Sequence, residues 1–196
     1  MYGMIWSMSR PDLTPVSYVV LGLVARDGPS TPYAIKTAVG RGVAHFWPFP
    51  HSQIYSETER LARLGLLAEE REQTGRRRRS YRITPAGRAA LAAWLAEPAD
   101  EPPQFRSLGL LKLFFSQHTG PEHVAELARA QAELHRRTVE ITAAIVERLQ
   151  ARGDRPGQLA VAELMGDAYR VMAERWEQIG RAALEPPRPV EAARGR

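Results

Sequence analysis

The chain has 196 residues, a formal net charge of +5, 44% hydrophobic and 25% charged residues, as is typical of soluble globular proteins. It contains no cysteine, which excludes disulfides, thiolate metal sites and cysteine nucleophiles. No apolar run approaches the ~20 residues of a membrane-spanning helix, and residues 1–10 lack the features of a signal peptide. We therefore expect a cytoplasmic protein with no membrane partner.

The charge is concentrated in one half of the chain. Residues 14–97 carry a net charge of +5, whereas residues 98–184 carry −1. Arginine accounts for 25 of the 27 basic residues; codon bias explains arginine over lysine, but it does not explain the asymmetry. The pattern favours a polyanionic partner for the first half.

Proline-rich stretches at 98–103 and from residue 185 divide the chain. We expect five segments: a flexible N-terminal arm (1–13), a winged helix-turn-helix domain (14–97), a linker (98–103), a helical dimerisation and effector domain (104–184) and a disordered tail (185–196).

The predicted elements of the first half are three helices, a hairpin and a fourth helix. Thr14-Pro15 and Thr84-Pro85 each combine an N-cap with a first-turn proline, which is typical of helix starts, and Pro32 does the same with Ser30 or Thr31 as the cap. A third helix begins at about Ser52 and ends at Gly65. Two strands, 66–72 and 78–83, flank a turn, and three short helices followed by a hairpin make a winged helix-turn-helix.

The third helix is the expected DNA-reading element, because this helix can enter the major groove. Its inward face carries Ile54, Thr58 and Leu61, and its N-terminal end also favours phosphate. Gln53 can pair with an adenine edge. The candidate DNA contacts on this helix and its flank are Ser52, Gln53, Tyr55, Ser56, Arg60 and Arg63.

A run of four arginines, Arg76, Arg77, Arg78 and Arg79, marks the predicted wing tip. Four consecutive arginines at a turn are either solvated or paired with anions. Contact with DNA phosphates is the favoured interpretation; a merely solvated hairpin is the alternative.

These residues resemble the PadR-type transcriptional regulators over about 75 residues. The matching stretches are Tyr18-Val19-Val20-Leu21-Gly22-Leu23, Thr31-Pro32-Tyr33-Ala34-Ile35-Lys36, Phe46-Trp47, Gln53-Ile54-Tyr55, the segment 60–67 and the segment 79–87. The resemblance implies a homodimeric, usually repressive regulator that releases an inverted-repeat operator in double-stranded DNA when a small molecule binds. It also places Tyr33, Tyr55 and the wing arginines at or near DNA, and Lys36 joins these candidates. Pro32 and Ser56 depart from the family pattern, which has Gly and Pro there.

The second half is predicted to form three helices: 104–116, 121 to about 151, and a last helix ending near 184. The first is apolar nearly all round, so we expect it to be buried on more than one side. The second carries a heptad seam from Val124 to Leu149, which favours dimerisation over the alternative of a monomeric antiparallel bundle. The expected dimer contacts are Leu127, Leu134, Ile141, Ile145, Met172 and Trp176.

An effector site is expected between the two halves, where aromatic residues flank the linker. The resemblance implies a small, often aromatic or phenolic ligand. The candidate lining residues are Trp94, Phe105, Phe114 and Trp176, with ordinary core packing as the alternative.

The sequence carries no phosphate-binding loop, dinucleotide fingerprint, His-Glu-x-x-His motif or Gly-x-Ser-x-Gly elbow. We therefore expect no enzyme activity, no cofactor and no metal. The leading hypothesis is a ligand-responsive, DNA-binding repressor. The alternative is a winged-helix module that binds other proteins, which the arginine run disfavours.

Overall fold

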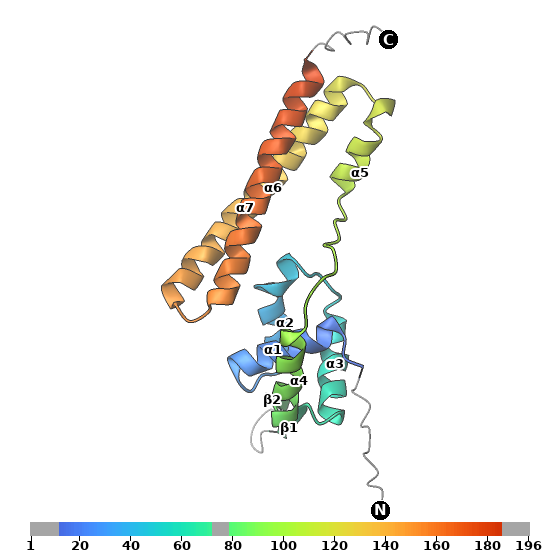
Figure 1. Cartoon of the computed structure of the whole chain (residues 1–196). Helices are drawn as coiled ribbons and strands as arrows, with labels where there is room; N and C mark the ends of the chain where they lie inside the picture. Colours follow the sequence, from blue (N-terminus) through green and yellow to red (C-terminus); the bar gives the residue numbers. More distant parts are fainter. Residues whose placement is uncertain (1–11, 72–78, 186–196) are drawn as a thin grey trace, which may run out of the picture. The chain divides into compact units, whose positions relative to one another are not determined.

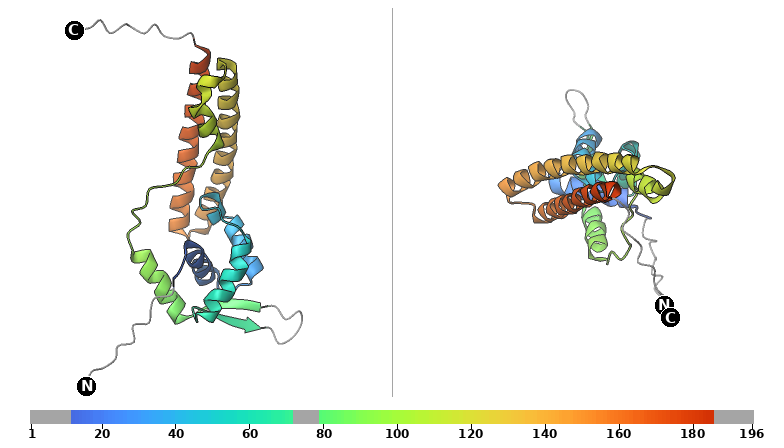
Figure 2. Two further views of the ribbon diagram at one scale, coloured as in Figure 1. Left: turned by 90° about the vertical axis from the view of Figure 1, so that its right-hand side faces the viewer. Right: turned by 90° about the horizontal axis from the view of Figure 1, so that it is seen from above.

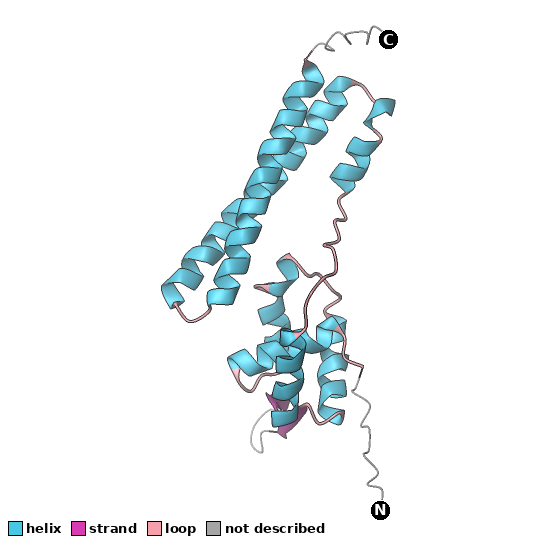
Figure 3. Ribbon diagram, viewed as in Figure 1, coloured by secondary structure: helices cyan, strands magenta, loops and turns pink. Residues whose placement is uncertain are grey.

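The structure is a computed structural model that describes residues 12–71 and 79–185. The chain divides into two compact units between Pro102 and Pro103; we call them the winged-helix unit and the helical unit. The described residues are mainly helical and contain one two-stranded sheet (Figures 1 and 3). The predicted fold class, mainly α with a β-hairpin, is confirmed. The expected arm up to residue 11 and the expected tail from residue 186 lie outside the described residues.

The winged-helix unit contains the predicted helices and hairpin in the predicted order. Its elements are α1 (Pro15–Asp27), α2 (Pro32–Gly40), the 3-10 turn η1 (Val43–His45), α3 (Ser52–Arg63), β1 (Leu67–Arg71), β2 (Arg79–Ile83) and α4 (Pro85–Ala96).

Threonine caps two of these helices. The Thr31 hydroxyl accepts a hydrogen bond from the Ala34 N–H at the start of α2, and the Thr84 hydroxyl accepts one from the Gly87 N–H at the start of α4. Each bond satisfies a backbone donor that lacks a partner inside its helix. The prolines that follow fit first-turn positions, where no N–H is needed.

The hairpin is antiparallel, with Leu67 opposite Ile83 and Arg71 opposite Arg79. Side chains alternate across a strand, so Tyr81 and Ile83 of β2 point into the core while Arg82 is exposed. The backbone of Ser30 adds a short bridge to β2, through reciprocal hydrogen bonds of 3.0 and 2.9 Å with Tyr81. The hairpin is thereby fixed to the segment that leads into α2.

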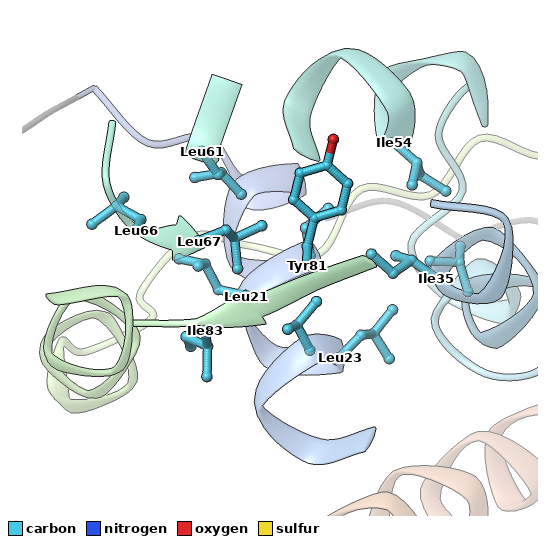
Figure 4. Packing of buried hydrophobic residues seen from close by; sticks show 12 residues of the cluster. Leu21, Leu23, Ile35, Ile54, Leu61, Leu66, Leu67, Tyr81 and Ile83 are labelled. Atoms are coloured by element: carbon cyan, nitrogen blue, oxygen red, sulfur yellow. The ribbon is translucent and has the colours of Figure 1, made fainter. Parts of the chain in front are cut away.

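The core of the winged-helix unit is built from large aliphatic side chains and one tyrosine. Figure 4 shows them converging from α1, α2, α3 and the hairpin. Almost all solvent is excluded from this core, whose buried members are Val20, Leu21, Leu23, Val24, Ile35, Val39, Ile54, Leu61, Leu66, Leu67, Tyr81 and Ile83. Burial of such side chains contributes about 1.5–3 kcal/mol each to folding, so this unit has a core of its own.

The helical unit consists of α5 (Leu108–Phe114), the 3-10 turn η2 (Ser116–His118), α6 (Pro121–Arg152) and α7 (Pro156–Leu184). The two long helices run side by side along most of their length, as both views in Figure 2 show. Gly153, in the left-handed region at φ 69°, ends α6, a conformation that glycine adopts without steric cost.

Helix α5 differs from the prediction in length and in burial. Residues 104–107 are not helical, and the Ser107 hydroxyl instead accepts a hydrogen bond from the Leu110 N–H as the N-cap. The expectation that this helix is buried on several sides is wrong for the single chain. Its large apolar side chains are mostly exposed, namely Leu108, Leu110, Leu111 and Phe114.

The fully buried positions between α6 and α7 are mainly small residues. Ala128 and Ala132 of α6 pack against Trp176 of α7, and Gly166 of α7 approaches Thr142 of α6. Small side chains let two helices approach closely, but they bury little apolar area.

Across the described parts of the chain, no helix is both long and apolar enough to span a membrane.

Candidate nucleic-acid interface

Helix α3 presents a polar face to solvent and an apolar face to the core. Ile54, Thr58 and Leu61 are buried, as their spacing predicts. The opposite side exposes the predicted DNA contacts Ser52, Gln53, Tyr55, Ser56 and Arg63. The Ser56 hydroxyl donates to the Gln53 carbonyl at 3.2 Å, so the two candidate reading residues stand one beside the other.

A recess of about 540 Å³ lies beside this face and joins three elements. It is lined by Thr31 and Pro32 at the start of α2, by Tyr33 and Tyr55, and by Arg79 of β2. Tyr33 is 70% exposed, so its ring and hydroxyl are accessible to a partner. Two phenol hydroxyls, a guanidinium and a helix start together suit an anionic, partly apolar ligand such as a nucleic-acid backbone.

Arg79 stands at the edge of the recess, and its Nε lies 3.6 Å from Glu69 Oε1 on the neighbouring strand. A hydrogen bond from Arg71 is the main cause that lowers the pKa of Glu69, and the charge of Arg79 adds to it. Glu69 is therefore ionised, and a phosphate would compete with it for Arg79. The remaining wing arginines, Arg76, Arg77 and Arg78, lie outside the described residues.

Two predicted DNA contacts are placed differently from the rest. Lys36 is half-buried on α2. Arg60 turns toward the protein, where its Nη1 donates to Glu57 Oε1 at 2.8 Å and its Nη2 donates to the backbone carbonyl of Asp12. The sequence alone suggested a flank position for Arg60 and no role for Glu57, because Asp12 and Ser17, which complete these contacts, lie 48 and 40 positions away in the chain.

Each of the two units matches a known protein family. Residues 20–93, which contain the recess, match the transcriptional regulator PadR-like family. Residues 105–175 match the virulence activator alpha C-term family. Residues 20–93 of this chain therefore form a PadR-like transcriptional regulator domain. The second match corresponds to the longer form with a helical C-terminal domain, and the family's members are regulators rather than enzymes.

Individual relatives support the assignment. The negative transcriptional regulator PadR of Bacillus subtilis (strain 168) is 24% identical over 141 residues, which are 71% of this chain and 77% of that protein. The crystal structure of Bacillus subtilis PadR in complex with operator DNA matches with a TM-score of 0.77 and 22% identity, over 86% of this chain and 98% of that one. The complex of the same protein with p-coumaric acid matches with a TM-score of 0.73 and 23% identity, over 87% and 99%.

The expected effector residues of this PadR-type chain lie in different surroundings. The Trp94 ring stacks on the Tyr18 ring, with centroids 4.4 Å apart and an interplanar angle of 5°. Phe105 and Phe114 are exposed, and Phe114 meets Phe115 edge to face. Trp176 is only 4% exposed and belongs to the α6–α7 core. Of the four, Trp176 is thus a core residue of the single chain.

The expected dimer residues also differ in how far their side chains are exposed. Leu134 and Ile141 on α6 are 54% and 51% exposed, whereas Leu127, Ile145 and Met172 are half-buried. The heptad seam of α6 is therefore offset from the stripe that packs on α7, which is formed by Ala128, Ala132 and Thr142.

Among the residues that the structure describes, no group of three or more potential ligands could hold a metal ion.

Proposed function

We propose that this PadR-type regulator is a homodimeric repressor that reads an inverted-repeat operator with α3 and grips the DNA backbone with the wing. The observation that carries the proposal is the recess beside the polar face of α3, where Tyr33, Tyr55 and Arg79 meet. Its position supports backbone contact next to base readout by Gln53 and Ser56. The operator complex of Bacillus subtilis PadR is a supporting precedent on the same fold.

The exposed seam of α6 supports the dimer. Leu134 and Ile141 are large aliphatic side chains on one stripe, one heptad apart, and the single chain leaves both half exposed. A seam of this kind packs against a second helix in coiled coils. Two copies held together would place two α3 helices on two half-sites of an inverted repeat.

An effector is the last part of the proposal. The precedent is p-coumaric acid, which Bacillus subtilis PadR binds in a crystal structure. A planar phenolic compound suits aromatic side chains such as Trp94, Phe105 and Phe114. Such a ligand would release the operator only through its different affinities for the DNA-competent and DNA-incompetent dimers.

Titration with random-sequence duplex DNA at rising salt tests DNA binding. We expect log affinity to fall linearly with log salt, and Arg79→Ala to reduce the slope by about 0.9, which is the effect of losing one phosphate contact. Leu95→Ala, at an exposed position on α4, is the control. A protein with almost no salt-sensitive affinity for random duplex would instead be a winged-helix module for protein partners.

Replacement of Gln53 by Ala tests base readout. We expect a loss of about 1–3 kcal/mol on a duplex selected from a random pool, with little change on random DNA, because only base contacts are removed. Equal losses on both duplexes would assign Gln53 to the DNA backbone instead.

The effector is tested with tryptophan fluorescence during titration with p-coumaric acid. We expect quenching in the parent protein and less quenching in Trp94→Phe, with Trp176→Phe as the buried control. The same compound should weaken binding to the selected duplex. Quenching that is unchanged in Trp94→Phe would remove Trp94 from the effector site.

A further inference from the structure

A buried serine links α1 to the DNA-reading helix. Ser17, on the first turn of α1, is 0% exposed. Its Oγ accepts a hydrogen bond from the Thr14 N–H at 2.9 Å and donates to Glu57 Oε1 of α3 at 2.6 Å. The single hydroxyl proton is thus committed to a carboxylate on another element, which makes this a charge-assisted and directional bond.

The carboxylate of Glu57 has a second donor. Its Oε1 also accepts from Arg60 Nη1 at 2.8 Å, and the same guanidinium donates to the Asp12 carbonyl just before α1. The Glu57 side chain is only 13% exposed. We call the set of Ser17, Glu57, Arg60 and the Asp12 carbonyl the α1–α3 tether.

The α1–α3 tether restricts small rotations of α3 that apolar packing alone tolerates. Ile54, Thr58 and Leu61 hold α3 on the core, but apolar attraction has no direction and tolerates small rotations of a helix. Hydrogen bonds to a fixed carboxylate are directional. Glu57 follows Gln53 by one helical turn and is adjacent to Ser56, so it anchors the stripe beside the candidate reading residues.

We propose that the α1–α3 tether sets the angle at which α3 presents Gln53 and Ser56 to base edges, so that Glu57 and Arg60 are positioning residues for sequence discrimination. Arg60 then acts through Glu57 and does not contact phosphate. The proposal rests on the proposed function, because it requires α3 to read DNA. It assigns a role to Ser17 and Glu57, and it gives Arg60 a role different from the one its sequence position suggested.

The first experiment measures discrimination, defined as the ratio of the dissociation constants for a scrambled duplex and for a duplex selected by the wild-type protein. Glu57→Gln and Ser17→Ala should each lower this ratio by about tenfold, the equivalent of one lost charge-assisted hydrogen bond. Binding to the scrambled duplex should stay within about twofold, because no phosphate contact is lost. Glu133→Gln on α6 makes the same charge change at another arginine-paired carboxylate and should leave the ratio unchanged.

The second experiment separates positioning from phosphate contact. Arg60→Met should lower discrimination while leaving the salt slope of binding unchanged, and Arg60→Lys, which keeps a donor for Glu57, should restore most of the ratio. Arg63→Met is the matched control on the same helix. Arg63 is exposed, so its loss should lower the slope by about 0.9 and leave discrimination nearly intact.

Thermal unfolding of every variant accompanies both measurements. Variants that unfold at lower temperature but keep the wild-type ratio would overturn the proposal, since the tether would then serve stability alone. A fall in salt slope with Arg60→Met would also overturn it, because Arg60 would then be a phosphate contact. A wild-type protein without salt-dependent DNA affinity would reject the proposed function itself. Tether variants that bind DNA normally and keep the wild-type ratio would reject only the role of the tether.

Discussion

The two units of this chain bury their apolar residues in opposite ways. In the winged-helix unit, leucines, isoleucines and valines from five elements close around Tyr81 and exclude solvent. In the helical unit, the buried residues are mainly alanine, glycine and threonine together with Trp176, while leucines and phenylalanines of α5 and α6 are exposed. The first unit completes its own core, whereas the second leaves many of its leucine and phenylalanine side chains available for another surface.

This difference indicates which part of the regulator depends on its surroundings. Large exposed apolar patches are rare on monomeric proteins and mark interaction surfaces. We expect the unit with the closed core to hold a fixed geometry, and the unit with exposed apolar side chains to respond to a second subunit or to a ligand. Four tests of this difference between the two units follow, from the largest expected effect to the smallest.

Charge at the exposed seam should separate the subunits. In Ile141→Glu an unpaired carboxylate would be buried in the proposed dimer, at a cost of about 4 kcal/mol, or roughly a thousandfold in the dimerisation constant. Sedimentation should report monomer, with unfolding of the winged-helix unit unchanged. Ala143→Glu adds the same charge at an exposed position away from the seam and should remain dimeric. If Ile141→Glu also remains dimeric, the seam is not the interface.

Truncation in the closed core should destabilise the winged-helix unit. Leu21 is completely buried on α1, so Leu21→Ala should cost about 3 kcal/mol through lost burial and the cavity left behind. Leu95→Ala on α4 removes the same atoms from an exposed side chain and should cost less than about 0.5 kcal/mol. Urea unfolding measures both. A small loss for Leu21→Ala would mean that the core relaxes around the cavity and is not closed.

The sequence predicted the winged-helix unit well because its signals are local. Three first-turn prolines, each following a candidate cap, marked helix starts, and alternation in the segment around Tyr81 marked the second strand. The inward face of α3 followed from the spacing of Ile54, Thr58 and Leu61 alone, and all three are buried.

Contacts between distant residues could not be predicted in this way. Arg60 turns inward because Glu57 and the Asp12 carbonyl accept its donors, and Glu57 is held there by Ser17, 40 positions away. On α6, a heptad seam was visible in the sequence. It could not show that the neighbouring stripe of Ala128, Ala132 and Thr142 would pack on α7 and leave the seam residues Leu134 and Ile141 exposed.

Gly87 in the winged-helix unit and Gly109 in the helical unit differ in how well their surroundings can accept an added Cβ. A Cβ at Gly87 would lie 2.2 Å from the Leu66 carbonyl oxygen, which is backbone and cannot move aside. A Cβ at Gly109 of α5 would lie 2.3 Å from Oε1 of Gln131, the end of a flexible side chain. We expect Gly87→Ala to cost about 2 kcal/mol and Gly109→Ala less than about 1 kcal/mol by urea unfolding. Equal costs would mean that α5 is held as rigidly on α6 as α4 is held on the wing.

The smallest expected effect is a pH dependence of the helical unit. His135 of α6 stacks on Tyr169 of α7, with ring centroids 5.8 Å apart, and burial lowers the pKa of His135 below its ordinary value of 6.5. The unfolded chain therefore binds a proton more readily than the folded one. The stability linked to this group is present above pH 6.5 and is lost as the pH falls toward the lowered folded pKa. The urea midpoint of the helical unit should fall slightly from pH 7.5 to pH 5.5 in the wild type. His135→Gln, which cannot titrate there, should show a smaller fall. An identical fall in both proteins would assign the pH dependence to other groups and leave His135 as a packing residue only.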